Sequence, residues 1–134
     1  MIVTLQVELV SPERIVHSGE AEMVIARTEG GGDIAFMAGH VPFIGILAIH
    51  PLRIIAGDGS EEMMAVHSGF VEVSGDRVAI LSDVCEVQDE IVVERAREAR
   101  DRAREAAEAD PADEKAERAL RRALVRLEVA GVTE

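Results

Sequence analysis

The sequence predicts a mainly β protein with added α structure: an N-terminal antiparallel β-sandwich over residues 1–87, followed by a C-terminal antiparallel two-helix hairpin over residues 88–134. Two observations support this division. Up to Val87, short apolar segments alternate with frequent glycine and aspartate turns, a pattern that favours an antiparallel sandwich or barrel. From Glu90 to about Gly131, alanines recur at helical spacing among charged residues.

The first strand is predicted from Val3 to Leu9, where apolar and polar residues alternate and one face can lie on a core. Further strands are expected wherever short apolar runs lie between turn-forming segments such as 30–32 and 57–59. No segment before Asp89 is long and periodic enough for a crossover helix, which disfavours a parallel sheet. The other expected strands are 15–17, 23–26, 34–37, 43–47, 52–56, 63–66, 70–73, 78–81 and 84–87.

The first helix of the tail carries a narrow apolar stripe made of alanines at 3-4-3 spacing: Ala96, Ala99, Ala103 and Ala106. A buried methyl-sized group contributes about 0.8 kcal/mol, whereas a buried Leu or Val contributes about 1.5–3 kcal/mol. Fixing the backbone of each residue costs about 1–2 kcal/mol. We therefore expect weak attachment of the hairpin to the sandwich, with docked and undocked states within a few kcal/mol; a permanently docked or always solvated hairpin stays open as an alternative.

The second helix is predicted to begin after Asp110, with Pro111 at its first position and Asp113 near the positive end of its dipole. Gly131 is the residue type suited to a left-handed C-terminal stop. Because the connection is short, the two helices are expected to run antiparallel. The apolar stripe of the second helix is Ala116, Leu120, Ala123, Leu127 and Ala130.

Composition and charge exclude several classes of protein. The net charge is −12, and residues 1–86 carry 4 basic and 13 acidic side chains. Such a surface repels phosphate, and a chain without Trp or Tyr has little to stack on bases, so we expect no nucleic-acid binding. The single cysteine, Cys85, is expected to be a small buried hydrophobe in a reducing compartment. We expect neither an export signal nor a membrane span, so membrane association would come only through a protein partner.

Motifs for catalysis are missing from the sequence. The glycine run 30–32 lacks the Lys-Ser/Thr of a phosphate loop, and no serine stands in a GxSxG motif. The four histidines, His17, His40, His50 and His67, show neither HxH nor HxxxH spacing. We therefore expect no enzyme active site, no metal and no cofactor.

Arginines stand out on the second predicted helix of this acidic chain, and two interpretations stay open. They can complement the helix dipole and aid solubility. They can also form a docking strip for an acidic partner, since arginine makes directional bonds to carboxylates. These residues are Arg118, Arg121, Arg122 and Arg126.

An ordered set of motifs resembles the epsilon subunit of F-type ATP synthases over essentially the full length. These are the segments Val10-Ser11-Pro12-Glu13 with Ser18-Gly19-Glu20, Gly39-His40-Val41-Pro42, Gly69-Phe70-Val71-Glu72-Val73, and Ile91 through Ala96. The resemblance implies a non-catalytic rotor subunit of the central stalk that couples the gamma subunit to the c-ring in proton-driven ATP synthesis. It also implies a peripheral position on the cytoplasmic face of the bacterial plasma membrane.

The resemblance assigns roles to two groups of residues. In the family, the loop before the glycine-histidine motif faces the c-ring, and basic residues of the second helix meet the beta (and alpha) subunits and impede ATP hydrolysis. The implied c-ring residues are Gly31, Gly32, Asp33 and His40. The implied inhibitory residues are Arg118, Arg121, Arg122 and Arg126.

One departure bears on nucleotide binding. Some family members bind ATP through an Ile/Leu-Asp-x-x-Arg-Ala motif in the first helix. Here Ile91, Arg95 and Ala96 match it, but Val92 replaces the aspartate. We therefore expect no nucleotide sensing through this motif.

Two other classes of protein are compatible with the same patterns. The first is a stand-alone β-sandwich adaptor whose helical hairpin serves for dimerisation, and co-purification with a gamma subunit separates it from a rotor subunit. The second is a cupin-type enzyme, which would need a metal site assembled around residues such as His40 and His67.

Overall fold

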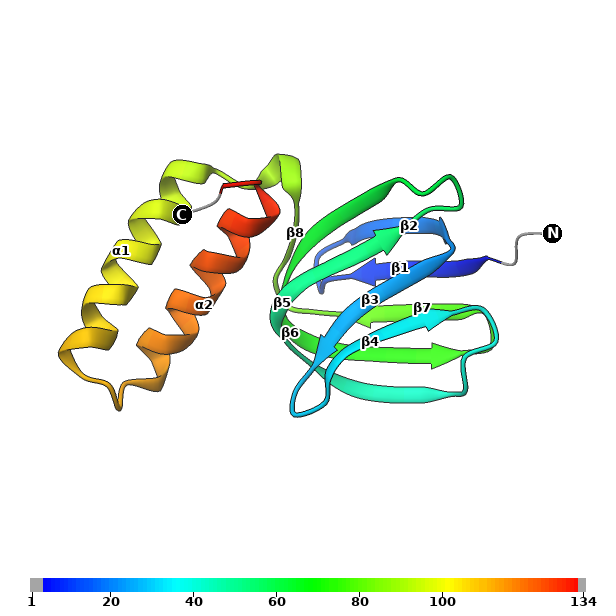
Figure 1. The fold of residues 1–134 in the computed structure, drawn as a ribbon, viewed down its shortest axis with the longest axis horizontal. Coiled ribbons are helices and arrows are strands. Elements are labelled where there is room, and N and C mark those ends of the chain that lie inside the picture. Colours follow the sequence, from blue (N-terminus) through cyan, green and yellow to red (C-terminus); the bar gives the residue numbers. More distant parts are fainter. Residues whose placement is uncertain (1–3, 133–134) are drawn as a thin grey trace.

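The computed structural model describes residues 4–132, which form a β domain followed by two helices (Figure 1). The expected fold class, a β-sandwich followed by a helical hairpin, is confirmed. The elements are β1 (Leu5–Val10), β2 (Ile15–Ala21), β3 (Met23–Thr28), β4 (Gly32–Met37), β5 (Phe43–Ile55), β6 (Glu61–Ser74), β7 (Arg77–Leu81), β8 (Cys85–Val87), a 3-10 turn η1 (Gln88–Glu90), α1 (Val93–Ala109) and α2 (Glu114–Val129).

The strands form a continuous sheet in the order β2-β1-β7-β6-β5-β3-β4, with β8 paired to β6. All of the paired strands are antiparallel except β1 and β7, which run parallel with Val7 opposite Val78. The sandwich is therefore mainly antiparallel, as expected, with one parallel pair that the sequence analysis did not predict. A parallel pair needs a long connection, and five intervening strands supply it here in place of a crossover helix.

Two long strands replace four of the short ones expected. Segment 43–47 and residues 52–55 of the next segment belong to β5, and segments 63–66 and 70–73 belong to β6. The break between the two segments of β6 reflects an irregularity in that strand, where Ser68 has a φ of 62° and Gly69 a φ of 129°. A Cβ at Gly69 would lie 2.2 Å from the carbonyl oxygen of Leu81, so this position requires glycine.

One apolar core lies between the strands of the β domain. The alternation in β1 places Leu5, Val7 and Leu9 inside, each fully buried, as the sequence predicts. Cys85 joins this core at 6% exposure, and burial raises the pKa of its thiol. The expected role of this cysteine as a buried hydrophobe is confirmed.

The helical hairpin differs from expectation at its N-terminal boundaries. Helix α1 begins at Val93, after η1. Of the predicted alanine stripe, Ala96 and Ala103 are buried, whereas Ala106, near the C-terminal end of the helix, is exposed. Helix α2 begins three residues later than predicted, because Asp113, and not Asp110, is its N-cap and accepts a hydrogen bond from the Ala116 N–H at 3.1 Å. Asp110 ends α1 instead.

Two aspartates three residues apart both fit the sequence pattern of a cap, and the turn between the helices decides between them. Asp110 accepts from the Ala112 N–H at 3.1 Å, and this contact closes the turn that contains Pro111. The predicted C-terminal stop is confirmed, since Gly131 has a φ of 83° and donates to the Glu128 carbonyl at 3.0 Å.

Helix α2 lies between α1 and the β domain (Figure 1). It packs on β5 and β6, whereas α1 packs on α2. Neither helix is long and apolar enough to cross a membrane.

Candidate interaction surfaces

An apolar contact between α2 and the sheet holds the hairpin in its docked position. Val125 and Val129, each 2% exposed, pack with the fully buried Ala65 of β6, and Ile49 and Met63 border this cluster. The sequence analysis described a mostly alanine stripe and did not identify these two valines as part of the attachment. The available signal was the pair of valines at i and i+4 beside the alanine stripe, which form a second apolar face of the helix.

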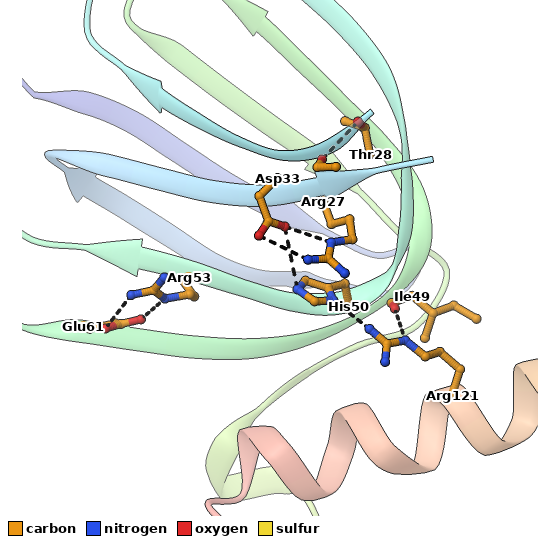
Figure 2. Close-up of polar contacts among 9 residues, drawn as sticks. Arg27, Thr28, Asp33, Ile49, His50, Arg53, Glu61 and Arg121 are labelled. Atoms are coloured by element: carbon orange, nitrogen blue, oxygen red, sulfur yellow. Dashed lines mark hydrogen bonds and ion pairs between the residues drawn. The ribbon is translucent and has the colours of Figure 1, made fainter. Parts of the chain in front are cut away.

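Arg121 continues this face one turn earlier and makes two polar contacts with β5. Its Nε donates to the Ile49 carbonyl at 3.1 Å, and its terminal nitrogen lies 2.8 Å from Nδ1 of His50 (Figure 2). On the other side of the ring, Nε2 of His50 lies 3.8 Å from Asp33 of β4. Asp33 is held by Arg27 of β3 at 2.9 and 3.2 Å, and this hydrogen bond lowers the pKa of Asp33.

Arg126 makes a second polar contact, with β8. Its Nε donates to Oε1 of Glu86 at 2.7 Å, and Nε2 of His67 donates to the same oxygen at 2.8 Å. His67 is 5% exposed. Burial acts to raise the pKa of Glu86, but hydrogen bonds from His67 and Arg126 outweigh it, so the pKa of this carboxyl lies below its usual value.

The other two arginines of the predicted strip are placed differently. Arg118 lies 4.0 Å from Glu114, one turn earlier on the same helix, and its side chain is 56% exposed. Arg122 is half-buried. The strip thus divides into two residues that fasten the hairpin, Arg121 and Arg126, and two that do not contribute to those contacts.

The residues implied for c-ring contact do not form one patch. Gly31, Gly32 and Asp33 lie at the exposed turn between β3 and β4. His40 lies at the other end of β4, in the turn before β5, where its ring packs edge-on against Phe36 at 5.0 Å. Since a six-residue strand is about 20 Å long, the structure separates His40 from the other three residues.

The degenerate nucleotide motif lies along a cleft of about 370 Å³ between α1 and the end of α2. Arg95, Ala96 and the 52%-exposed Val92 line it, together with Glu86 and Arg126. Ile91 instead turns towards the cluster beneath α2. The residue at the aspartate position of the motif is therefore an apolar side chain at the edge of a charged cleft.

An exposed apolar surface on the sheet was missed by the sequence analysis. Ile46 of β5 is paired with Phe70 of β6, which is paired with Leu81 of β7, and their exposed fractions are 52%, 56% and 48%. Directly paired residues on neighbouring strands lie on the same face of a sheet. Ile44, 75% exposed and two residues before Ile46, extends this surface. We call these four residues the apolar sheet surface.

Comparison with known proteins agrees with this architecture. The family model described as "ATP synthase, Delta/Epsilon chain, beta-sandwich domain" matches residues 4–88. The ATP synthase epsilon chain of Shouchella clausii is 42% identical over 128 residues, which are 95% of each chain. That of Streptomyces griseus is 44% identical over 132 residues, 98% of this chain and 99% of the relative. The chain belongs to the ATP synthase epsilon chain family.

Solved structures share the fold of this epsilon family chain at lower sequence identity. A chain in the cryo-EM structure of Euglena gracilis mitochondrial ATP synthase, described as OSCP/F1/c-ring, matches with a TM-score of 0.71 and 20% identity, over 96% of this chain and 78% of that one. A chain in the Tetrahymena thermophila structure of the central stalk and c-ring matches with a TM-score of 0.52, 16% identity, and coverage of 65% and 69%.

The described part of this family member, residues 4–132, contains no group of three or more His, Cys, Asp and Glu side chains placed to hold a metal ion. Its main surface features are the apolar sheet surface, the exposed turn between β3 and β4, and the arginines of α2. The apolar sheet surface is the feature least expected on a chain that is alone in solution.

Proposed function

We propose that the chain is a non-catalytic rotor subunit of the ATP synthase central stalk, which couples the gamma subunit to the c-ring in proton-driven ATP synthesis. Its place would be peripheral, on the cytoplasmic face of the bacterial plasma membrane. The observation that carries this proposal is the relationship to ATP synthase epsilon chains over 95% or more of the chain, the hairpin included.

The apolar sheet surface is our candidate for the contact with the gamma subunit. A contiguous group of large apolar side chains on a folded domain favours burial against a protein partner. Covering a Phe, Leu or Ile side chain contributes about 1.5–3 kcal/mol when burial is complete. Phe70, in the middle of the three-strand row, is the residue expected to contribute most.

The turn between β3 and β4 is our candidate for the c-ring contact. Gly31, Gly32 and Asp33 lie together there and are exposed, so they can meet a polar loop of a partner. His40 is left out of this contact because it lies at the opposite end of β4.

Regulation of ATP hydrolysis by the hairpin is the finer part of the proposal. In the docked position Arg121 is bound to β5 and Arg126 to Glu86. Both must leave these partners before they can bind an acidic segment of the beta or alpha subunits. The docked hairpin is therefore the non-inhibitory state, and release exposes the four arginines together.

The test uses the assembled enzyme. Deleting residues 88–134 should leave co-purification with the gamma subunit intact and raise the rate of ATP hydrolysis. The double variant Arg118→Gln with Arg122→Gln should raise hydrolysis too, because it removes two candidate inhibitory charges and leaves the Arg121 and Arg126 contacts in place. An unchanged rate in the deletion would rule out inhibition, whereas loss of co-purification of the unaltered chain with gamma would rule out the subunit assignment itself.

A further inference from the structure

His50 lies where three elements meet beside the docked hairpin (Figure 2). Arg121 of α2 reaches its Nδ1 at 2.8 Å, and Asp33 of β4 faces its Nε2 at 3.8 Å. Arg27 of β3 and Glu128 of α2 are the other charged groups that act on this ring. Strands β3 and β4 and helix α2 thus contribute the charges around His50, and two of these charges, Arg121 and Glu128, belong to the hairpin, whereas its neighbour on β6 is the uncharged Val66.

The contact with Arg121 determines the protonation state of the ring. A guanidinium only donates hydrogen bonds, so Nδ1 of His50 must accept and cannot carry a proton. The proton of the neutral ring then lies on Nε2, which faces Asp33. A second proton on Nδ1 would set two positive donors against each other at hydrogen-bond distance.

We propose that His50 makes docking of the hairpin sensitive to protons: protonation of its ring breaks the Arg121 contact and loosens α2 from β5. This inference goes beyond the proposed function and does not depend on it, because docking is a property of the chain by itself.

The electrostatic surroundings act in the same direction. Burial of the ring, followed by the charges of Arg27 and Arg121, lowers the pKa of His50. Asp33 and Glu128 oppose this, but the carboxylate of Asp33 is already bound at both oxygens by Arg27. When α2 leaves, Arg121 and part of the burial leave with it, so the pKa returns towards its ordinary value.

The sign of the pH dependence follows from this difference. The docked state binds fewer protons at His50 than the undocked state, so the contribution of the Arg121 contact to docking is fully present above the ordinary histidine pKa of about 6.5 and is lost as the pH falls through the lowered pKa of the docked state. A single proton changes the docking equilibrium by at most about tenfold for each pH unit.

The experiment follows methyl contacts by NMR in the full chain. Cross-relaxation between the methyl groups of Ala65 and those of Val125 and Val129 reports docking directly, because these side chains pack together beneath α2. Lowering the pH from about 8 to about 5.5, across the range in which histidine titrates, should weaken these contacts by several-fold. Contacts that stay constant across this range would overturn the proposal.

Variants assign the effect to one histidine. His50→Gln should keep docking and remove its pH dependence, because an amide oxygen can accept from Arg121 and does not titrate here. His40→Gln, at the opposite end of β4 from Asp33, should leave the pH dependence unchanged. If the dependence survives in His50→Gln and disappears in His67→Gln, whose ring bonds to Glu86, the proposal is wrong.

A second measurement tests the proposal without any substitution at His50, and so applies even if a His50 variant folds poorly. In Arg121→Gln, the titration midpoint of the His50 ring protons should rise relative to the unaltered chain, because a cation that disfavours protonation is gone. An unchanged midpoint would mean that the hairpin and the His50 proton are not linked.

Discussion

Shortening the valines on the face of α2 that packs on the sheet should release the hairpin without unfolding the sandwich. Val125 and Val129 are each 2% exposed, and Val→Ala removes the equivalent of two methylene groups. At about 0.8 kcal/mol for each buried methylene, one substitution costs about 1.6 kcal/mol of docking free energy. Because about 1.4 kcal/mol corresponds to a factor of ten, Val125→Ala should lower the docking equilibrium constant by about 10–20-fold at 25 °C.

The two apolar clusters of the chain make this prediction specific to the hairpin. Val125 and Val129 pack with Ala65, whereas the sandwich core of Leu5, Val7 and the other inward-facing residues forms a separate cluster. Since α1 packs mainly on α2, both helices are expected to leave as one unit. Slow amide exchange in β1 should therefore be unaffected by the change.

Amide hydrogen exchange at one neutral pH measures both effects in the same sample. The expected result is faster exchange in α2 of Val125→Ala and unchanged exchange in β1. Val41→Ala is the matched control, because it removes the same two methylene equivalents from a side chain that is 69% exposed. Equal loss of protection in α2 and β1 would refute the independence of the hairpin, and unchanged protection in α2 would refute the role of the valine contact.

Two further predictions test single positions in the β domain and at its contact with α2. Gly69→Ala should lower the free energy of unfolding by more than about 2 kcal/mol, because the added Cβ meets the Leu81 carbonyl and the backbone conformation is strained. The control is Gly75→Ala, at a residue with a φ of 60° and open space around it. It should lower the free energy of unfolding by only about 1–2 kcal/mol in the same chemical denaturation. Glu86→Gln should weaken α2 docking at neutral pH. The lowered pKa of Glu86 also means that its contribution is present above the ordinary carboxyl range and is lost as the pH falls through the lowered value, so the variant should lack this acid-dependent step in α2 exchange.

The fold was predictable wherever the signal is local. Alternation in β1 placed Leu5, Val7 and Leu9 correctly, and Gly131 marked the end of α2. The parallel pairing of β1 with β7 was not predictable in this way, because strand partners far apart in the sequence leave no mark on the period of either strand. The same limit hid the joining of short apolar segments into β5, and into β6 across the irregularity at Ser68 and Gly69.

The sequence named candidate residues, but their arrangement in space came from the structure. The sequence singled out the arginines of α2 as candidates, and the structure shows that Arg121 and Arg126 bind the β domain while Arg118 lies near Glu114 of its own helix. It grouped His40 with Asp33, which the length of β4 keeps apart. The apolar sheet surface was missed because Ile46, Phe70 and Leu81 are ordinary strand residues until pairing places them side by side.

The sequence by itself determined the division into a strand-rich domain and a helical hairpin, the charge of each part and the lack of catalytic motifs, because periodicity and composition are properties of neighbouring residues. Only the tertiary structure decided that His50 touches Arg121, that Glu86 joins His67 to Arg126, and that Val125 lies on Ala65. These contacts join residues from 19 to 71 positions apart, and their energies depend on burial and geometry that arise only once the chain has folded.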